Sequence, residues 1–197
     1  MTAKDFLTKI ANWLSKLISP ATKGRTLPTL PPPPALIETI KNNAPIEPND
    51  PRWETIYNKA AWEKEWNIGT TCADYLGYVL QKAGLDPACL EPKGRFRTGA
   101  RLFQCAERKH AILRSPKLSD LQKGDIFEVR EPGNPSNWHV GFIWEINGDN
   151  IITVDGGQGT IGAQRVDYVR RRWTEKDGRG FFGKRRIVYI IRPGILF

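Results

Sequence analysis

The sequence predicts an α+β fold in which helices pack on one face of an antiparallel β-sheet. Apolar residues recur at helical spacing between residues 69 and 84. From residue 124 onward the spacing changes to a period of two, and Asn147-Gly148 marks a hairpin turn between two such runs. Helices followed by a meander of strands are typical of α+β proteins, whereas alternating helices and strands indicate a parallel sheet.

Composition limits the class of protein and of partner. The chain has 197 residues, 40% hydrophobic and 26% charged, which indicates one globular domain with an extension at one end. The net charge of +9 favours anionic partners: nucleic acid, acidic lipid, or an anionic polymer such as a bacterial cell wall. The three cysteines form no C-x-x-C pair, which argues against a structural zinc site. A Cys89–Cys105 disulfide is the one pairing that leaves Cys72 free, and the sequence leaves open whether it forms.

The chain divides into three segments. Residues 1–18 carry the pattern of an amphipathic N-terminal helix, residues 19–51 form a Pro-rich linker with a short helix at 35–42, and residues 52–197 form the domain. The first helix is expected to pack on its own domain or on a partner, and its basic and aromatic residues also suit membrane-surface contact by residues 4–18. No apolar run is long enough to span a membrane, and the N-terminus lacks the apolar core of a secretory signal peptide.

The stretch at residues 70–84 is the predicted helix around which the chain is organised. Thr70 or Thr71 can cap its first turn, and Gly84 can take the left-handed conformation that ends a helix. Its apolar face includes Cys72, which lies in the first turn, where the helix dipole favours a thiolate. Cys72 is therefore a candidate nucleophile, and the alternative is a small buried core residue.

A candidate base and carboxylate lie on the predicted hairpin. Alternation places His139, Gly141, Ile143 and Glu145 on one face, and Asp155 on the same strand face as Ile151 and Thr153. The turn at 147–150 makes the two strands antiparallel neighbours, so Asp155 is expected near His139. If this sheet face packs on the Cys72 helix, the three side chains form the arrangement in which His takes the thiol proton and Asp orients the ring.

Four motifs in this order resemble a known family. They are Thr71-Cys72-Ala73-Asp74-Tyr75, Gly124-Asp125-Ile126-Phe127, His139-Val140-Gly141-Phe142-Ile143 and Val154-Asp155-Gly156-Gly157. This order is similar to that of the papain-like cysteine hydrolases of bacterial cell walls, the NlpC and CHAP groups, over roughly residues 65–160. The resemblance implies a papain-like core, with the nucleophile helix packed on an antiparallel sheet of about five to six strands.

The resemblance also implies roles for individual residues. Cys72 would attack the carbonyl carbon, His139 would act as base and then acid, and Asp155 would orient His139. Gln158 competes for the orienting role, and the supporting candidates are Asp125, for which turn capping is the alternative, and Trp138. The family needs neither a metal nor an organic cofactor, so none is expected. His110, in a Lys- and Arg-rich segment, is expected to be a solvated surface residue.

The implied function is hydrolysis of amide bonds in peptidoglycan, as an endopeptidase or amidase. The expected settings are a phage lysin or an antibacterial toxin, made in the cytoplasm and delivered to the periplasm or cell wall without a cleaved signal. An immunity protein, or secretion machinery that contacts the N-terminal segment, would then be a partner. The alternatives are an acyltransferase or a thioester or lipid hydrolase, and a basic nucleic-acid-binding module. No recognised nucleic-acid-binding motif occurs, so no nucleic acid is expected. The basic runs 170–173 and 184–186 are solvated faces or an anion-holding surface.

Overall fold

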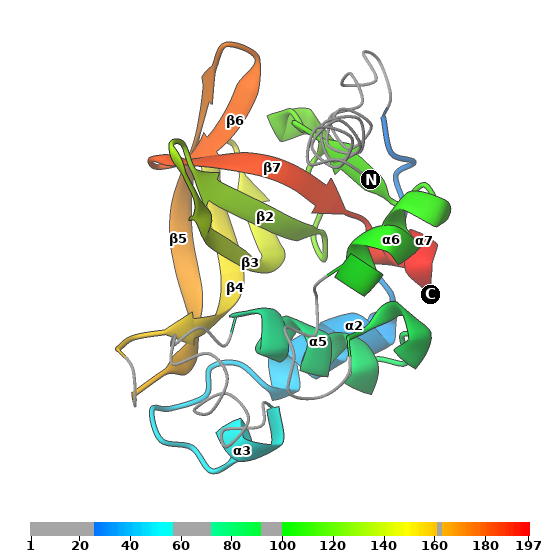
Figure 1. The fold of residues 1–197 in the computed structure, drawn as a ribbon, viewed down its shortest axis with the longest axis vertical. Helices are drawn as coiled ribbons and strands as arrows, with labels where there is room; N and C mark the ends of the chain where they lie inside the picture. Colours follow the sequence, from blue (N-terminus) through cyan, green and yellow to red (C-terminus); the bar gives the residue numbers. More distant parts are fainter. Residues whose placement is uncertain (1–25, 57–71, 92–99, 161–162) are drawn as a thin grey trace, which may run out of the picture.

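A computed structural model describes residues 26–56, 72–91, 100–160 and 163–197, and its centre is a closed β-barrel (Figure 1). The strands of the barrel are β2 (Ile126–Glu131), β3 (Asn134–Asn147), β4 (Asn150–Gln158), β5 (Arg165–Lys176), β6 (Arg179–Phe182) and β7 (Arg185–Ile191). A short strand, β1 (Ile112–Arg114), is added alongside the second half of β7. All pairings are antiparallel.

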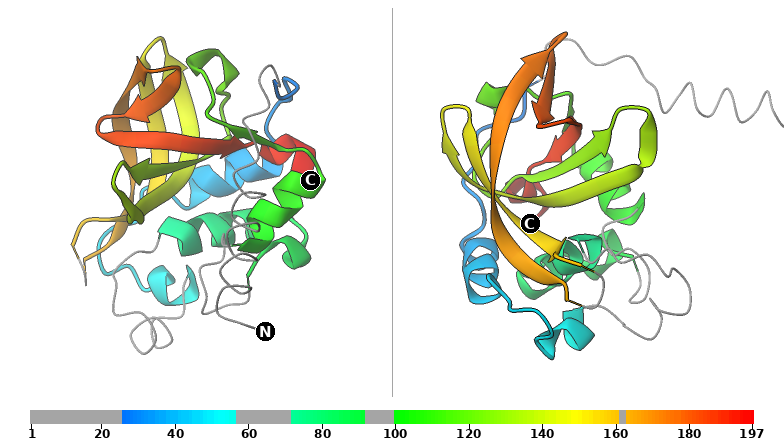
Figure 2. Two further views of the ribbon diagram at one scale, coloured as in Figure 1. Left: turned by 45° about the horizontal axis from the view of Figure 1, so that its top comes forward. Right: turned by 90° about the vertical axis from the view of Figure 1, so that its left-hand side faces the viewer.

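The barrel closes through β7. Each strand from β2 to β6 pairs with the next one along the chain, and β7 pairs with β6 on one edge and with β2 on the other. The first half of β7 meets β6, with Phe182 opposite Arg185, and the whole of β7 follows β2. Where the barrel closes, none of these six strands has an unpaired edge, so no edge is open there to pairing with another chain. The curl of the strands is seen from two further sides in Figure 2.

The predicted fold class was wrong. The described residues form a closed six-stranded barrel with one extra strand and few helices, in place of a papain-like core with a helix packed on an open sheet of five to six strands. Strand β6, which completes the closure, was not predicted from the sequence. Its signal was present: Asp177 and Gly178 have φ of 52° and 66°, as a tight hairpin turn between β5 and β6 requires. Because β6 is only four residues long, it carries too few alternating positions for its period to be recognised.

Alternate residues of the strands fill the barrel. The buried cluster inside it contains aromatic and β-branched side chains from β2 to β7, together with one leucine of β1 and two from outside the strands: Leu27, Leu113, Leu121, Phe127, Val129, Ile143, Ile151, Trp173, Phe182, Ile187 and Ile190. Trp173 packs edge-to-face on Phe182, which packs edge-to-face on Phe127. The interior is therefore a packed core and not a channel.

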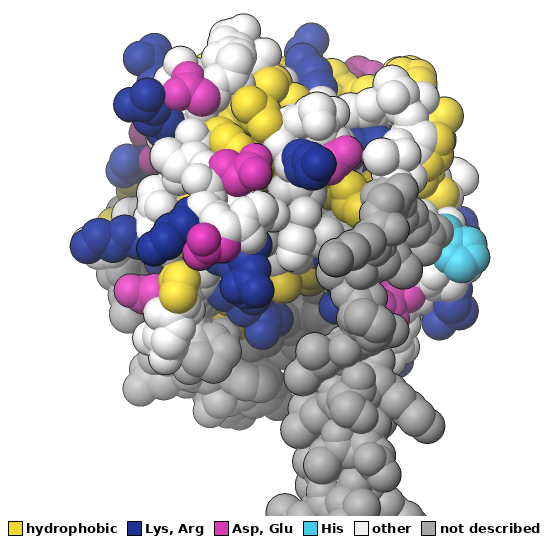
Figure 3. All heavy atoms as spheres, turned by 90° about the horizontal axis from the view of Figure 1, so that it is seen from above, with side chains coloured by type: hydrophobic (Ala, Val, Ile, Leu, Met, Phe, Trp, Pro, Cys, Tyr) yellow, Lys and Arg dark blue, Asp and Glu magenta, His cyan; other side chains and the backbone are white. Residues whose placement is uncertain are grey.

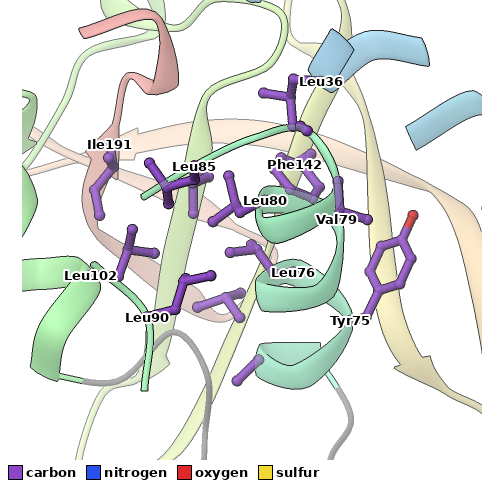
Figure 4. Packing of buried hydrophobic residues seen from close by; sticks show 14 of the residues in the cluster. Leu36, Tyr75, Leu76, Val79, Leu80, Leu85, Leu90, Leu102, Phe142 and Ile191 are labelled. Carbon is purple, nitrogen blue, oxygen red and sulfur yellow. The ribbon is translucent and has the colours of Figure 1, made fainter. Parts of the chain in front are cut away.

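The helices lie outside the barrel and share a second core with its outer face. They are α2 (Pro34–Asn42), α3 (Arg52–Ile56), α5 (Cys72–Lys82), α6 (Ala100–Arg108) and α7 (Pro193–Leu196), with 3₁₀ turns at Pro87–Cys89 and Leu118–Asp120. Figure 4 shows Leu76 and Leu80 of α5 among Leu85, Leu90 and Leu102, with Phe142 of β3 behind the helix. A disulfide between Cys89 and Cys105 joins the Pro87–Cys89 turn to α6. Within the described ranges, no helix is long and apolar enough to cross a membrane.

Helix α5 ends as its sequence predicts. Gly84 has a φ of +96°, and the N–H of Leu85 donates to the carbonyl of Leu80, which satisfies a carbonyl that the helix itself leaves open. The apolar face is also confirmed, because Cys72, Leu76, Val79 and Leu80 are all buried. The capping role of Thr70 and Thr71 lies outside the described residues.

The described part of the Pro-rich segment is packed against the barrel and its helices. Leu36 and Ile40 of α2, the helix predicted at 35–42, are fully buried in the outer core. Leu27 enters the barrel cluster, and Ile46 forms an isolated bridge with Val166. The predicted helix at 1–18 lies outside the described residues, and the division of the chain at residues 18 and 51 stays a prediction.

A buried arginine ties three segments together. Arg192, which follows β7 and is 2% exposed, donates through Nε and NH2 to the two carboxylate oxygens of Asp125, at 3.0 and 2.9 Å. Its NH1 and NH2 also donate to the carbonyls of Pro28 and Asp120, at 2.7 and 2.6 Å. The guanidinium fork therefore holds the Pro-rich segment, the turn before β2 and the end of β7 at one point.

We expect Arg192→Met to lower the free energy of unfolding by about 3–5 kcal/mol, because it leaves the Asp125 carboxylate buried without its partner. Urea unfolding followed by circular dichroism measures the loss. Arg172→Met is the matched control: Arg172 is 77% exposed and pairs with Asp149 at the surface, so its loss should cost at most about 1 kcal/mol. Equal losses of unfolding free energy in the two variants would show that the buried Arg192–Asp125 pair stabilises the fold no more than a surface ion pair does.

Candidate active site

A β-bulge in the β3–β4 hairpin sets the position of Asp155. Near the turn Asn147 is opposite Asn150 and Glu145 opposite Ile152, but past the bulge Ile143 is opposite Thr153 and Phe142 opposite Val154. The bulge shifts the register by one residue, which places Asp155 beside Gly141 and on the face that carries His139. The predicted alternation placed Glu145 on the same face as His139, and the bulge makes this wrong. Ile146 takes the inward position instead: it lies opposite Ile151 and packs on the barrel cluster.

Gly141 makes room for the carboxylate. A Cβ built on Gly141 would overlap Asp155 Oδ1 and would lie 3.0 Å from two ring carbons of Phe127. The missing side chain therefore lets Asp155 lie flat against β3, with Oδ2 3.0 Å from Nε2 of His139. Asp155 is fully buried, and His139 is 8% exposed.

A second glycine brings the nucleophile helix close to the same hairpin. A Cβ on Gly156 would overlap the Cβ of Tyr75, so α5 can approach β4 only because residue 156 has no side chain. Helix α5 packs on β3 and β4, with Cys72 in its first turn (Figure 1). The Cys72 thiol is 1% exposed and forms a hydrogen bond with His139.

His139 thus lies between a thiol and a carboxylate. Nε2 is bonded to Asp155, which leaves Nδ1 as the ring nitrogen for the thiol. Burial alone would lower the pKa of His139, but the negative charge of Cys72 and the hydrogen bond to Asp155 raise that pKa to about 9. A pKa of about 9 keeps the His139 imidazole protonated at neutral pH, and a protonated imidazole stabilises a thiolate beside it.

Asp155 has a second cationic partner. Oδ2 also accepts a hydrogen bond from NH2 of Arg171, a residue of β5 whose side chain runs through the barrel interior. Burial alone would raise the pKa of Asp155, but the bond and charge of His139, together with Arg171, hold it below its usual range. Asp155 therefore stays ionised although no part of it is exposed.

The structure brings together three of the six predicted site residues: Cys72, His139 and Asp155. Gln158 donates to the carbonyl of Gly156 at 3.2 Å, and the bond to His139 comes from Asp155. Asp125 is bound to Arg192 and accepts the N–H of Gln122 at 2.9 Å, which agrees with the structural alternative of a turn cap. Trp138 is half-buried and packs against the outer core.

Arg171 was not among the predicted site residues. The run at 170–173 was expected to be a solvated face or an anion-holding surface, but within it only Arg170 and Arg172 are exposed. Alternation was the available signal, because it places Arg171 on the same face as the buried Trp173. His110, as predicted, is an exposed residue just after α6.

The described residues contain no group of three or more His, Cys, Asp or Glu side chains that could hold a metal ion. Comparison of the chain with known protein families, with curated proteins and with solved structures finds no match. The resemblance to cell-wall hydrolases stays a prediction from the order of the sequence motifs.

We expect Gly141→Ala to displace the Asp155 carboxylate and so to lower the pKa of His139 from about 9 toward its ordinary 6.5. The chain has only two histidines, so NMR of protein labelled at histidine resolves the titration directly. Gly133→Asn is the control, since Gly133 has a φ of +83° that Asn tolerates and has open space around it. A His139 titration that stays near pH 9 in Gly141→Ala would contradict the proposed role of Gly141.

Proposed function

We propose that the protein is a cysteine hydrolase that cleaves amide bonds in bacterial peptidoglycan. The observation that carries this proposal is the contact of one imidazole with both the first-turn thiol of α5 and a buried carboxylate. A thiol held by a base, and a base held by an orienting acid, is the arrangement that nucleophilic acyl transfer requires. The substrate class, amide bonds of peptidoglycan, is inferred from the order of the four sequence motifs.

In the first half-reaction the Cys72 sulfur attacks the carbonyl carbon of the amide. The electron pair of the C=O bond moves to oxygen, and His139, which holds the thiol proton, faces the departing nitrogen. When the tetrahedral intermediate collapses, the C–N bond breaks and the imidazolium gives its proton to the amine. The products are a free amine and a thioester on Cys72.

In the second half-reaction His139 takes a proton from water, and the resulting hydroxide adds to the thioester carbonyl. The C–S bond then breaks, which restores the thiolate–imidazolium pair and releases a carboxylic acid that loses its proton to water. Asp155 fixes which ring nitrogen faces the sulfur throughout and stabilises the imidazolium. The N-terminal end of α5 points the positive end of its dipole at the sulfur, which also suits the charge that develops on the substrate oxygen.

The basic surface of the barrel supports an anionic polymer as substrate. Arg130, Arg179 and Arg186 line a hollow of about 410 Å³ near the ends of β2, β6 and β7, with Phe181 on its wall. Figure 3 shows Lys and Arg side chains gathered on the barrel side of the molecule. The stem peptides of peptidoglycan carry free carboxylates, which such a surface would attract.

The disulfide supports a site of action outside the cytosol. Cys89 and Cys105 are bonded and buried, while Cys72 takes no part in a disulfide. Disulfides persist in oxidising compartments such as the periplasm and the cell surface. A toxin or a lysin that acts on the wall would meet such conditions.

Wild-type protein incubated with purified sacculi should release peptide or sugar-peptide fragments, and Cys72→Ala should release none. Mass spectrometry of the soluble fraction detects the fragments and identifies the bond that is cut. Cys89→Ala/Cys105→Ala is the control, because it removes the other two cysteines and should keep activity if the fold survives without its disulfide. Absence of fragments from the wild type would refute the substrate, and equal release by Cys72→Ala would refute the nucleophile.

Arg179→Gln/Arg186→Gln should weaken binding to sacculi about fivefold at low salt, because each surface charge contributes about 0.5 kcal/mol. The difference should vanish at high ionic strength, where these charges are screened. Co-sedimentation at two salt concentrations measures both effects. Lys41→Gln/Lys82→Gln removes the same charge from α2 and α5, away from the hollow, and should bind like the wild type. Equal binding by both double variants at low salt would exclude the hollow as a binding surface.

A further inference from the structure

Arg171 is a charged residue in the barrel interior, and apolar packing does not account for it. Its register partner is Ile151, so its side chain enters the barrel core, where it is 15% exposed. The guanidinium carbon lies 5.5 Å from the centre of the Phe127 ring and 5.7 Å from that of Phe182. A cation held against two aromatic faces is fixed in orientation as well as stabilised.

The guanidinium is also held by hydrogen bonds. Nε donates to Oγ1 of Thr153 at 3.0 Å, and NH2 donates to Oδ2 of Asp155. Thr153 and Asp155 are alternate residues of β4 and face the same way, so one planar group contacts both. The chain of contacts runs from Arg171 through Asp155 and His139 to Cys72.

We propose that Arg171 is a positioning residue of the site, which keeps Asp155 ionised and its Oδ2 directed at His139. The inference rests on the proposed function for its catalytic meaning, but its measurement requires no substrate. Arginine suits the role because its charge is permanent at any pH at which the protein folds.

The charges of the four groups explain the need for this residue. The Cys72–His139 pair is neutral overall whether the proton is on sulfur or on nitrogen, and Asp155 adds one buried negative charge. Asp155 Oδ1 has no hydrogen-bond partner among the described residues, so Oδ2 carries the whole interaction. Without Arg171 the site would hold a net charge in a dry interior, which proteins avoid by taking up a proton.

The surroundings contain few other charges that could replace Arg171. Helix α5 presents Cys72 and Tyr75, whose hydroxyl pKa is raised by burial. Asp167 of β5, the register partner of Asp155, is bound to Arg165 at 2.7 Å. Strands β2 and β6 present uncharged side chains to the guanidinium: Phe127 and Phe182.

Removal of a fixed positive charge should raise the pKa of every group close to it. In Arg171→Met we expect the His139 titration, and the pH midpoint of Cys72 alkylation by iodoacetamide, to move up by about one unit. Arg171→Lys keeps the charge and should return both midpoints to within a few tenths of the wild type. Arg170→Met removes the same charge from the exposed face of β5 and should leave both unchanged.

NMR of histidine-labelled protein and alkylation against pH are the two measurements, with thermal unfolding as the check on folding. A residue with a purely structural role would lower the melting temperature but leave the midpoints in place, and that result would overturn the proposal. If Arg171→Met does not fold, Arg171→Gln replaces it, because its amide can still donate to Asp155 without a charge. Midpoints in Arg171→Gln equal to those of Arg171→Lys would likewise overturn the proposal.

The experiment separates this proposal from the proposed function. Shifted midpoints with no release of fragments from sacculi would support Arg171 and remove the peptidoglycan assignment. Release of fragments from sacculi with unshifted midpoints in Arg171→Met would support the peptidoglycan assignment and overturn the proposed role of Arg171.

Discussion

The buried carboxylate of Asp155 is the constraint on which the site depends. A carboxylate that is fully removed from water must be matched by cations and hydrogen bonds, or it takes up a proton. Two groups meet this requirement from opposite sides, His139 on β3 and Arg171 on β5. Because each contact comes from a different strand, the carboxylate can be satisfied only when β3, β4 and β5 are in register.

Two glycines make this arrangement possible by removing volume where the chain segments approach. Gly141 leaves space for the Asp155 carboxylate, and Gly156 leaves space for Tyr75 of α5. The first sets the distance between acid and base, and the second sets the distance between the helix and the hairpin. The site is therefore defined as much by missing side chains as by the three groups that carry the chemistry.

Closure of the barrel gives the site its rigidity. Arg171 can reach Asp155 only through the interior, and its position there is fixed by Phe127 of β2 and Phe182 of β6, which lie on the two sides of the closure. Arg192 performs a comparable task at the other end, where it joins Asp125 to the Pro-rich segment. Two buried arginines thus connect segments that are distant in sequence: Arg171 contacts Asp155 of the site, and Arg192 contacts Asp125 and the Pro-rich segment.

The sequence by itself determined the local features: the helix that begins near Cys72 and ends at Gly84, the hairpin at 147–150, and the pairing of Cys72 with His139 and Asp155 as candidates. The helix and the hairpin follow from short-range periods and turn residues, which act within a few positions along the chain, whereas the three candidates come from the order of the motifs. Only the tertiary structure decided that the sheet closes and that Arg171 faces inward. It also decided that the bulge after Ile143 moves Asp155 onto the His139 face, because strict alternation across the hairpin would place Asp155 opposite Phe142 on the other face. Register between strands is set by packing across the whole barrel, and no local pattern in the hairpin specifies where one residue is added.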